Sequence, residues 1–278
     1  MKEKKLNLKK HLNTVVTLNS DYLNLLDLMQ ITNANFPIRT FSHSFGVETY
    51  IRKDIVFDGE SLIKALLLYM NEQLLHGDLL AIYQIFKLLP KQKINAIWEI
   101  DQSDKLSRFS KRDSLKVQRR IGQQMVKIYN ELFNCELLVE YAERIKNKKS
   151  YGNPAVAFAL LAMHLKIDLK TALYTHLYST VAALTQNCVR AIPLGQVKGQ
   201  KIIYQLKHVY FDDIVNKVFT LILKQIFAKI YQALKLPNGT LRHTCSIVHV
   251  IIKVLVKHYI NHKNTILIFL ENLKKKEN

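Results

Sequence analysis

The histidines and cysteines are the residues of this chain most able to do chemistry, but their spacing supplies little of it. His258 and His262 are four residues apart and would share one helix face, where two imidazoles can hold a divalent metal. Tyr259 stands where a zinc hydrolase of this pattern has its glutamate base. Cys135 and Cys188 lie in apolar, helical contexts, where a thiol is usually an inert packing group. The pattern favours exposed histidines on a basic face over a metal site, and it supports no catalytic centre.

The glycines do not form a phosphate-binding loop. All eight are scattered, and they satisfy neither G-x-x-x-x-G-K-[ST] nor G-x-G-x-x-G. No G-x-S-x-G nucleophile pattern occurs either. The sequence therefore predicts a protein that is not an enzyme and has no cofactor of its own, so that any nucleotide chemistry must come from a partner.

The chain is strongly basic, with a formal net charge of +19 at pH 7. A field of this sign attracts nucleic acid, anionic membrane and acidic proteins alike. Interleaved tyrosines and lysines in the C-terminal third leave a nucleic-acid binder open, although no recognition module is present. The Lys-rich tail leaves association with a membrane surface open. Solvated lysine-rich faces are the commoner explanation, so we expect neither nucleic-acid binding nor stable membrane association.

The termini and cysteines indicate the compartment. The first ten residues, MKEKKLNLKK, lead into HLNTVVTLNS instead of the apolar core of a secretory signal. The three cysteines lie far apart and include no C-x-x-C pair, which fits a reducing environment. We expect a cytoplasmic protein.

The helical pattern begins at Ser20. With only eight glycines and five prolines in 278 residues, long helices are favoured over sheets. A loop is expected around Pro37. Ser61 is expected to open a helix that Gly77 separates from a second one at Leu79–Leu89, the two forming an antiparallel hairpin.

The rest of the chain also has helical periodicity. Residues 91–149 are predicted to be helical, with an interruption at 102–112. Asn153 and Pro154 predict the start of a helix that is apolar on all sides at 155–165, which belongs at the centre of a bundle. Asp168 should cap a helix at 169–184, and after Pro193 a long run is expected from 196 to 234.

The expected architecture is an all-α, single-domain helical bundle at residues 20–234. Residues 1–19 form a basic N-terminal extension, and residues 235–278 form a basic tail whose Ile/Val/Lys/His-rich pattern fits a strand or a helix equally.

Two segments are unusually rich in functional side chains. Residues 36–50 are dense in aromatic and hydroxyl groups, and residues 184–200 place four amides and an arginine around a proline-broken helix junction. Polar groups in such a setting either fix the junction or face a partner. The candidate partner-binding or interface residues are Phe36, Phe41, Ser42, His43, Ser44, Glu48, Tyr50, Arg190, Gln196 and Gln200.

These two segments resemble signatures of one family. The first is similar to FPxGxFSHSxGxE and the second to (S/L)TQNxVRAIPLGQxxGQ, both of the urease accessory protein UreF family, and the similarity extends from about Ser20 to Leu223. The resemblance implies a helical homodimer. It also implies a scaffold or chaperone that works with UreD (also called UreH), the GTPase UreG and apo-urease subunits, and that inserts nickel as GTP is hydrolysed. Nickel would pass through or near the complex.

The sequence departs from the family at two places. Arg39 stands where the family usually has glycine, in a backbone position that suits a residue without a side chain. Residues 234–278 show nothing of the acidic and aromatic C-terminal stretch that is typical of the family.

Overall fold

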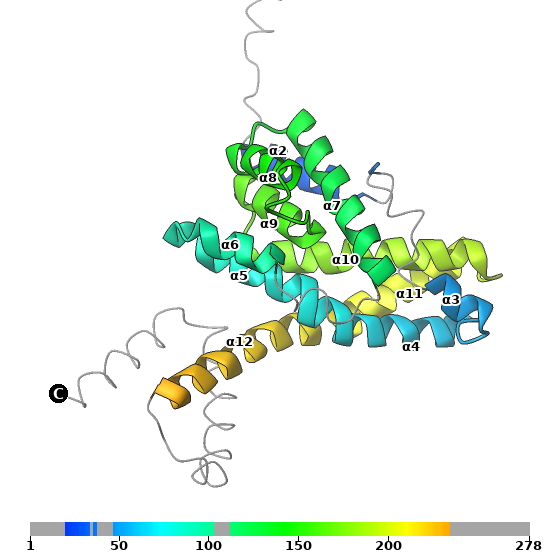
Figure 1. The fold of residues 1–278 in the computed structure, drawn as a ribbon. Coiled ribbons are helices and arrows are strands. Elements are labelled where there is room, and N and C mark those ends of the chain that lie inside the picture. Colours follow the sequence, from blue (N-terminus) through cyan, green and yellow to red (C-terminus); the bar gives the residue numbers. More distant parts are fainter. Residues whose placement is uncertain (1–19, 34–35, 38–46, 103–111, 234–278) are drawn as a thin grey trace, which may run out of the picture. The chain divides into compact units, whose positions relative to one another are not determined.

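The structure is a computed structural model that describes residues 20–33, 36–37, 47–102 and 112–233 (Figure 1). Every regular element in these ranges is a helix, so the predicted all-α class is confirmed. The expected extension at 1–19 and the tail at 235–278 lie outside the described residues. The chain divides into two compact units, 1–208 and 209–278, and each is described by itself.

The first helix, α2 (Ser20–Ile31), begins at the predicted residue and is followed by the short α3 (Val47–Arg52). Helix α4 (Gly59–Tyr69) starts earlier than expected, because Asp58 caps it and Ser61 lies inside its first turn. The Ser61 backbone N–H donates to Asp58 Oδ1 at 2.8 Å, and the Asp58 backbone N–H donates to Ser61 Oγ at 3.0 Å. This reciprocal capping box satisfies two backbone donors that the helix itself leaves unpaired.

The predicted hairpin around Gly77 was wrong. Helix α4 continues without a turn through a π-helical stretch, η2 (Met70–Leu79), into α5 (Leu80–Leu88), and Gly77 is buried inside this run. One glycine inside a helix costs only about 1 kcal/mol relative to alanine. Burial of neighbours such as Met70 and Leu74 offsets that cost. The run ends where expected, at the 3₁₀ turn η3 (Leu89–Lys91), which contains Pro90.

Three helices follow: α6 (Ile94–Gln102), α7 (Arg112–Leu132) and α8 (Glu136–Lys146). Helix α6 ends at Gln102 and α7 begins at Arg112, and the inner residues of the predicted interruption at 102–112 lie outside the described residues. A second break, at 133–135, was not predicted. Cys135 is the extended residue before α8 and does not lie inside a helix. Its thiol is buried, and burial raises its pKa, as expected for a packing group.

Helix α9 (Pro154–His164) is the predicted central helix. The Asn153 side chain accepts a hydrogen bond from the Ala155 backbone N–H at 2.8 Å, which confirms the predicted cap. All eight residues from 155 to 162 are buried. Helices α5 and α7 make most of the contacts with α9, and α6, α8 and η2 complete its surroundings. The core of the first unit therefore forms around this helix.

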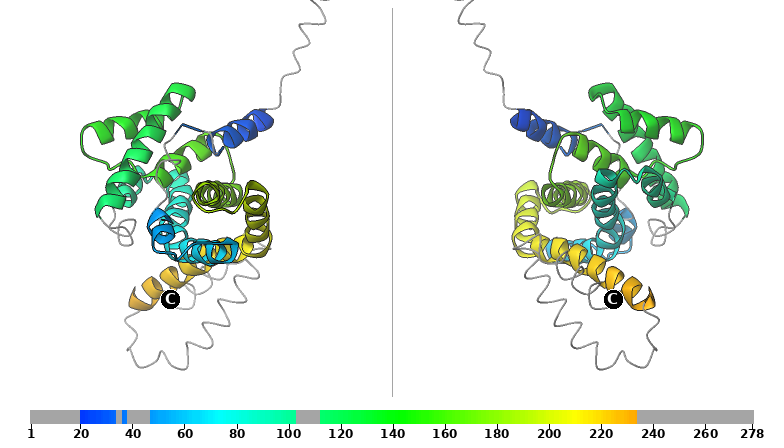
Figure 2. Two further views of the ribbon diagram at one scale, coloured as in Figure 1. Left: turned by 90° about the vertical axis from the view of Figure 1, so that its right-hand side faces the viewer. Right: turned by 90° about the vertical axis from the view of Figure 1, so that its left-hand side faces the viewer.

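Helix α10 (Leu169–Ala191) packs on α3, α4, η2 and α5. Asp168 caps it, as predicted, by accepting from the backbone N–H groups of Lys170 and Thr171. The helix extends to Ala191 and not to 184, and it ends at Ile192, which is extended because it precedes Pro193. Figure 2 looks almost along its axis, with α2 at the edge of the described helices.

The single run predicted from 196 to 234 is two helices. Helix α11 (Gln196–Val209) is separated from α12 (Phe211–Ala233) by Tyr210. Asp212 and Asp213 stand in the first turn of α12, where negative charge is favourable next to the helix dipole, and they mark a helix start inside the apolar periodicity. Helix α12 lies in the second unit.

A buried carboxyl group connects α6, α8 and the turn before α9. Asp101 Oδ1 accepts from the Tyr141 hydroxyl and from the Asn153 backbone N–H at 2.9 Å, and Oδ2 accepts from the Tyr151 backbone N–H. The Tyr141 ring stacks on Trp98, with 5.4 Å between centroids. Burial and the neighbouring Asp101 raise the pKa of Tyr141 well above its usual value, so its hydroxyl stays protonated and donates.

Helix α7 approaches the same turn at Gly122. A Cβ atom on Gly122 would lie 1.9 Å from the Gly152 carbonyl oxygen, and Gly152 itself has a φ of +85°. Only a residue without a side chain fits between α7 and this backbone. The turn is thus fixed from one side by Asp101 and from the other by Gly122.

We expect Gly122→Ala to lower the free energy of unfolding by about 3 kcal/mol or more, because the obstructing atoms are backbone and cannot rotate away. Gly59→Ala is the control. Its Cβ would make ordinary contacts at 3.5 Å, so a change within about 1 kcal/mol is expected. Chemical denaturation measures the free energy of unfolding of both variants. If Gly122→Ala were as stable as Gly59→Ala, α7 and the turn would not approach closely.

We expect Asp101→Asn to lower the free energy of unfolding by about 1–3 kcal/mol, because an amide N–H₂ would face a backbone N–H where a carboxyl oxygen now accepts. Glu99→Gln, on the exposed face of the same helix, should change little. The two variants are compared by urea denaturation at pH 7. A loss as large for Glu99→Gln would mean that the effect is one of net charge.

Candidate partner-binding groove

A stripe along α10 lines the floor of a surface groove. Residues 175, 179, 182, 186 and 190 recur at intervals of three or four and so lie on one helix face. The groove has a volume of about 500 Å³. Its lining residues come from α2 and the turn after it, from α10 and from α11: Met29, Thr32, Asn33, Thr175, Tyr178, Ser179, Ala182, Gln186, Arg190, Gln200 and Ile203.

The junction between α10 and α11 holds one end of this groove in place. After Pro193 the chain turns at Gly195, whose φ is +73°, and α11 then packs back on α10 at Gly199. A Cβ on Gly199 would lie 2.6 Å from Val189 Cγ2, so the two helices touch almost without intervening side chains. Cys188 is buried at this crossing, and burial raises its pKa to about 11, which keeps the thiol protonated and unreactive.

The structure brings together two of the predicted residues from the second segment. Arg190 and Gln200 both line the groove and are both exposed. Gln196 is the exposed first residue of α11 and is not part of the lining. Two of the three predicted polar residues at this junction thus belong to one surface.

Of the predicted residues of the first segment, the structure describes Phe36, Glu48 and Tyr50. Phe36 is buried, and its ring lies 6.0 Å from that of Tyr129. Tyr50 is exposed on α3, where its carbonyl accepts the backbone N–H groups of the residues 55 and 56 that follow the helix. Glu48 belongs to the same helix. Phe41, Ser42, His43 and Ser44 lie outside the described residues.

A smaller, partly open chamber of about 90 Å³ adjoins the groove and shares Thr32, Asn33 and Ser179 with it. His176 Nε2 lies 3.2 Å from Asp78 Oδ2, a pairing that also occurs in hydrolase triads. The Ser179 and Thr180 hydroxyls in the chamber donate to the His176 backbone carbonyl and not to its ring. Within the described residues, the chamber therefore contains no activated nucleophile.

Two tyrosines also face the chamber. Burial raises the pKa of Tyr129 and, together with the charge of Asp78, that of Tyr69, so both phenols are neutral near pH 7. Among the described residues none accepts or donates a hydrogen bond to the Tyr129 hydroxyl. The chamber is wide enough to hold water molecules that would satisfy it.

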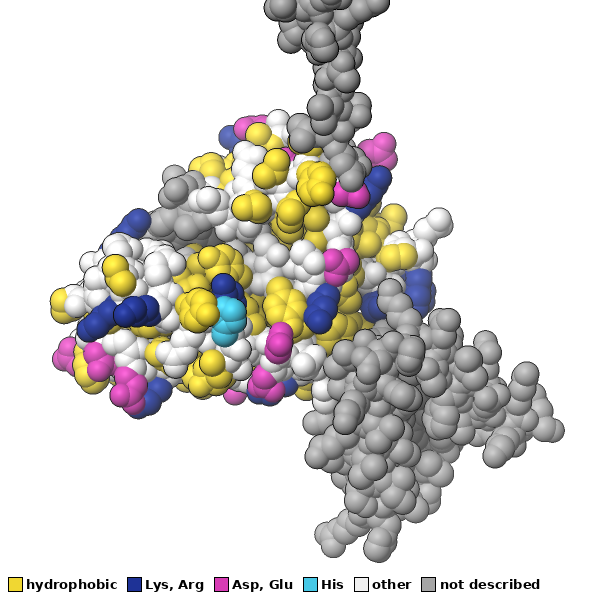
Figure 3. Space-filling model, turned by 180° about the vertical axis from the view of Figure 1, so that it is seen from behind, with side chains coloured by type: hydrophobic (Ala, Val, Ile, Leu, Met, Phe, Trp, Pro, Cys, Tyr) yellow, Lys and Arg dark blue, Asp and Glu magenta, His cyan; other side chains and the backbone are white. Residues whose placement is uncertain are grey.

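The groove is bordered by exposed apolar side chains. On α2, Tyr22, Leu23, Leu25, Leu26 and Met29 are 43–64% exposed. Figure 3 shows hydrophobic side chains gathered at the top of the described body, where α2 lies. Helix α11 adds exposed Val197 and Tyr204. Several large apolar side chains exposed on one helix, as on α2, are typical of protein-binding sites.

Comparison with known proteins identifies the family. The profile of the UreF family matches residues 56–207, which include α4 to α10 and most of α11. The chain belongs to the UreF family. The urease accessory protein UreF of Ureaplasma parvum serovar 3 is 90% identical to this UreF-family chain over 214 residues, which cover 77% of this chain and 91% of that protein.

Less similar relatives carry the same name. The urease accessory protein UreF of Ureaplasma urealyticum serovar 10 is 85% identical over 212 residues, covering 76% of this chain and 90% of its own length. That of Bacillus sp. (strain TB-90) is 38% identical over 183 residues, covering 66% and 80%.

Sequence reasoning missed part of the groove in this UreF-family chain. Tyr178, Ser179, Ala182 and Gln186 line it but were not among the predicted candidates. Counting back from Arg190 in steps of three or four, once the helix was known to reach that far, would have found them. Met29 and Asn33 also line the groove, but they lie far from α10 in the sequence. No motif near them indicates that they belong to it.

We expect Gly199→Ala to lower the free energy of unfolding by about 1–3 kcal/mol, because the added methyl meets a stiff, β-branched valine. The double variant Val189→Ala, Gly199→Ala removes the clashing methyl, so its loss should be smaller than the sum of the two single losses. Thermal and urea denaturation of the four proteins measure this. Simple additivity would contradict close packing of α10 on α11.

Proposed function

We propose that this protein is a non-catalytic, cytoplasmic urease accessory protein: a homodimeric scaffold that works with UreD (UreH), the GTPase UreG and apo-urease subunits to insert nickel. Family membership supports the urease role. In this proposal nickel is cargo, and GTP is hydrolysed by the partner, because this sequence contains no phosphate-binding loop.

The groove along α10 is the observation that supports a scaffold most directly. It combines an exposed arginine with two glutamines, Gln186 and Gln200, and its border is apolar on the α2 side. Arginine and tyrosine are the residues that most often dominate binding energy at protein interfaces, and the groove offers both in Arg190 and Tyr178. We assign the groove and its border to contacts with a second copy or with the assembly partners.

No competing function has comparable support. The described residues contain no group of three or more His, Cys, Asp or Glu side chains placed to hold a metal ion. None of the described helices is both long and apolar enough to cross a membrane. The chamber beside the groove pairs His176 with Asp78, but the hydroxyls among its described lining residues 179 and 180 donate to a backbone carbonyl.

We expect Arg190→Lys to weaken assembly about tenfold, because lysine keeps the charge but loses the planar fork of donors, and interface arginines typically carry ~1–2 kcal/mol. Gln200→Ala should act in the same direction. Light scattering measures the oligomeric mass, and urease activity of cells that express the maturation proteins measures function.

The controls are Arg120→Lys on α7 and Gln205→Ala on α11, both exposed and outside the groove. Thermal melts of all four variants show whether folding is intact. A stable Arg190→Lys protein with unchanged mass and full urease activation would remove Arg190 from the interface, and unchanged results for Gln200→Ala as well would remove the groove.

A further inference from the structure

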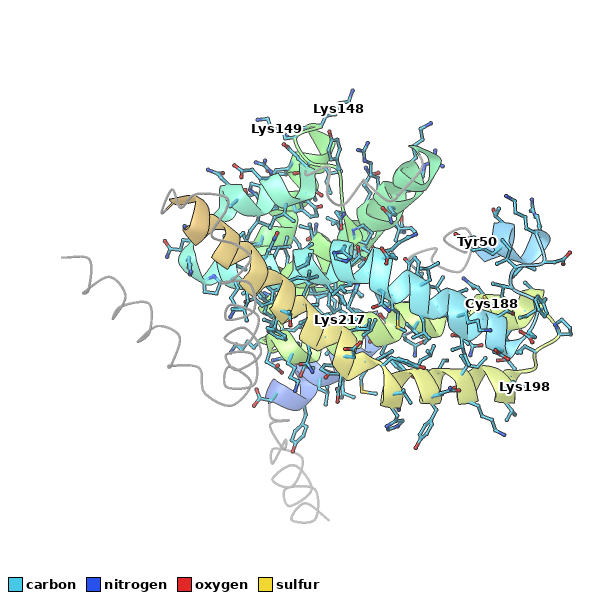
Figure 4. All side chains as sticks on the ribbon, turned by 90° about the horizontal axis from the view of Figure 1, so that it is seen from below. Tyr50, Lys148, Lys149, Cys188, Lys198 and Lys217 are labelled. Atoms are coloured by element: carbon cyan, nitrogen blue, oxygen red, sulfur yellow. The ribbon has the colours of Figure 1, made fainter. Side chains whose placement is uncertain are left out.

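The turn between α8 and α9 carries a concentration of positive charge on the first unit. Lys146, Lys148 and Lys149 are all exposed there, and we refer to residues 146–151 as the basic turn. Figure 4 shows Lys148 and Lys149 at the tip of the turn, pointing away from the helices. Among the described residues, no acidic side chain forms an ion pair with any of the three.

The backbone of the basic turn is held firmly. The Lys149 backbone N–H donates to the Arg144 carbonyl at 2.8 Å, and the Lys149 carbonyl accepts from Gln102 Nε2 of α6 at 2.6 Å. Asp101 holds the Tyr151 N–H from inside. A surface that is ordered before binding loses less conformational entropy when a partner arrives.

An arginine beside the turn is arranged to recognise carboxylates. The Arg119 guanidinium of α7 lies 3.8 Å from the centroid of the exposed Tyr151 ring. Stacking uses the flat face of a guanidinium and leaves the N–H groups along its edge directed outward. Those donors match the two oxygens of a carboxylate.

We propose that the basic turn, together with Arg119, is a second protein-binding surface that takes an Asp/Glu-rich segment of a partner. This rests on the proposed role as an assembly scaffold and names the chemistry of one further contact. The surface is distinct from the groove along α10, because the two have no lining residue in common.

An acidic protein segment fits this surface better than nucleic acid does. Affinity for a duplex grows with the number of phosphates neutralised along its length, and it needs a row of cations. Among the described residues, the cations of this surface are the lysines of the basic turn and Arg119 of the neighbouring α7. The guanidinium fork pairs with carboxylates and with phosphates alike, so the compactness of the cation cluster is what favours a short acidic segment.

The binding test uses the full chain and a fluorescently labelled peptide of six Glu-Ala repeats, with anisotropy as the readout. We expect the double variant Lys148→Glu, Lys149→Glu to bind the peptide about tenfold or more weakly. The matched control reverses two exposed lysines at the next turn along the chain, Lys166→Glu and Lys170→Glu, and it should stay within about twofold of the unmodified protein.

Two further variants separate recognition from simple charge. Arg119→Lys keeps the charge but loses the fork, and it should weaken peptide binding while a thermal melt stays unchanged. Lys148→Ala, Lys149→Ala tests the same surface without introducing new acidic groups, and it should weaken binding to a smaller extent than charge reversal.

The outcomes that overturn the proposal are distinct. Equal losses in the two charge-reversed proteins would mean that only net charge matters. Tighter binding of a short DNA duplex of equal charge, lost in the same Lys148/Lys149 variant, would assign the surface to nucleic acid. Because the peptide assay requires no urease, its failure is separate from failure of the scaffold role, which the groove variants and urease activation report.

Discussion

A helix whose residues 155–162 are all buried has no side to present to water, so other helices must surround it. Burial of each large side chain, such as Phe158 or Leu161, contributes roughly 1.5–3 kcal/mol. The need to cover α9 explains why α5 and α7 lie against it and why α6 and α8 complete its surroundings. The same requirement explains the Asp101 network, since the chain must enter this apolar environment through a turn whose backbone N–H groups need acceptors.

Helix α10 links this core to the candidate groove. One face packs on α3, α4, η2 and α5 through residues such as Leu173, Leu177 and Val181, while another lines the groove. Because the inner face is fixed by packing, the positions of the groove residues are fixed as well. The junction at Pro193 and the close contact at Gly199 then set where α11 contributes Gln200. A site built on helices in this way is more precise than one built on loops.

The surface chemistry of this UreF-family chain suits a protein that works through contacts. Five exposed apolar residues lie on α2, the polar groove is lined by residues of α2, α10 and α11, and three exposed lysines lie at the basic turn. A histidine and an aspartate do meet in the chamber, yet the hydroxyls around them are committed to a backbone carbonyl. Among the described residues, neither the Ser179 nor the Thr180 hydroxyl is hydrogen-bonded to the His176 ring.

The features that follow from interactions within a few residues were predictable from the sequence: the caps at Asn153 and Asp168, the end of α10 before Pro193 and the apolar character of α9 on every side. The two family signatures also located the groove residues Arg190 and Gln200. The positions at which helices continue or end were not predictable in this way. A glycine at 77 and an apolar run past 210 gave the wrong boundaries, because packing against distant helices decides whether a weak local signal ends a helix. Only the tertiary structure could decide which faces are exposed on α2 and which residues of α2, α10 and α11 share one groove, since residues far apart in the chain meet there.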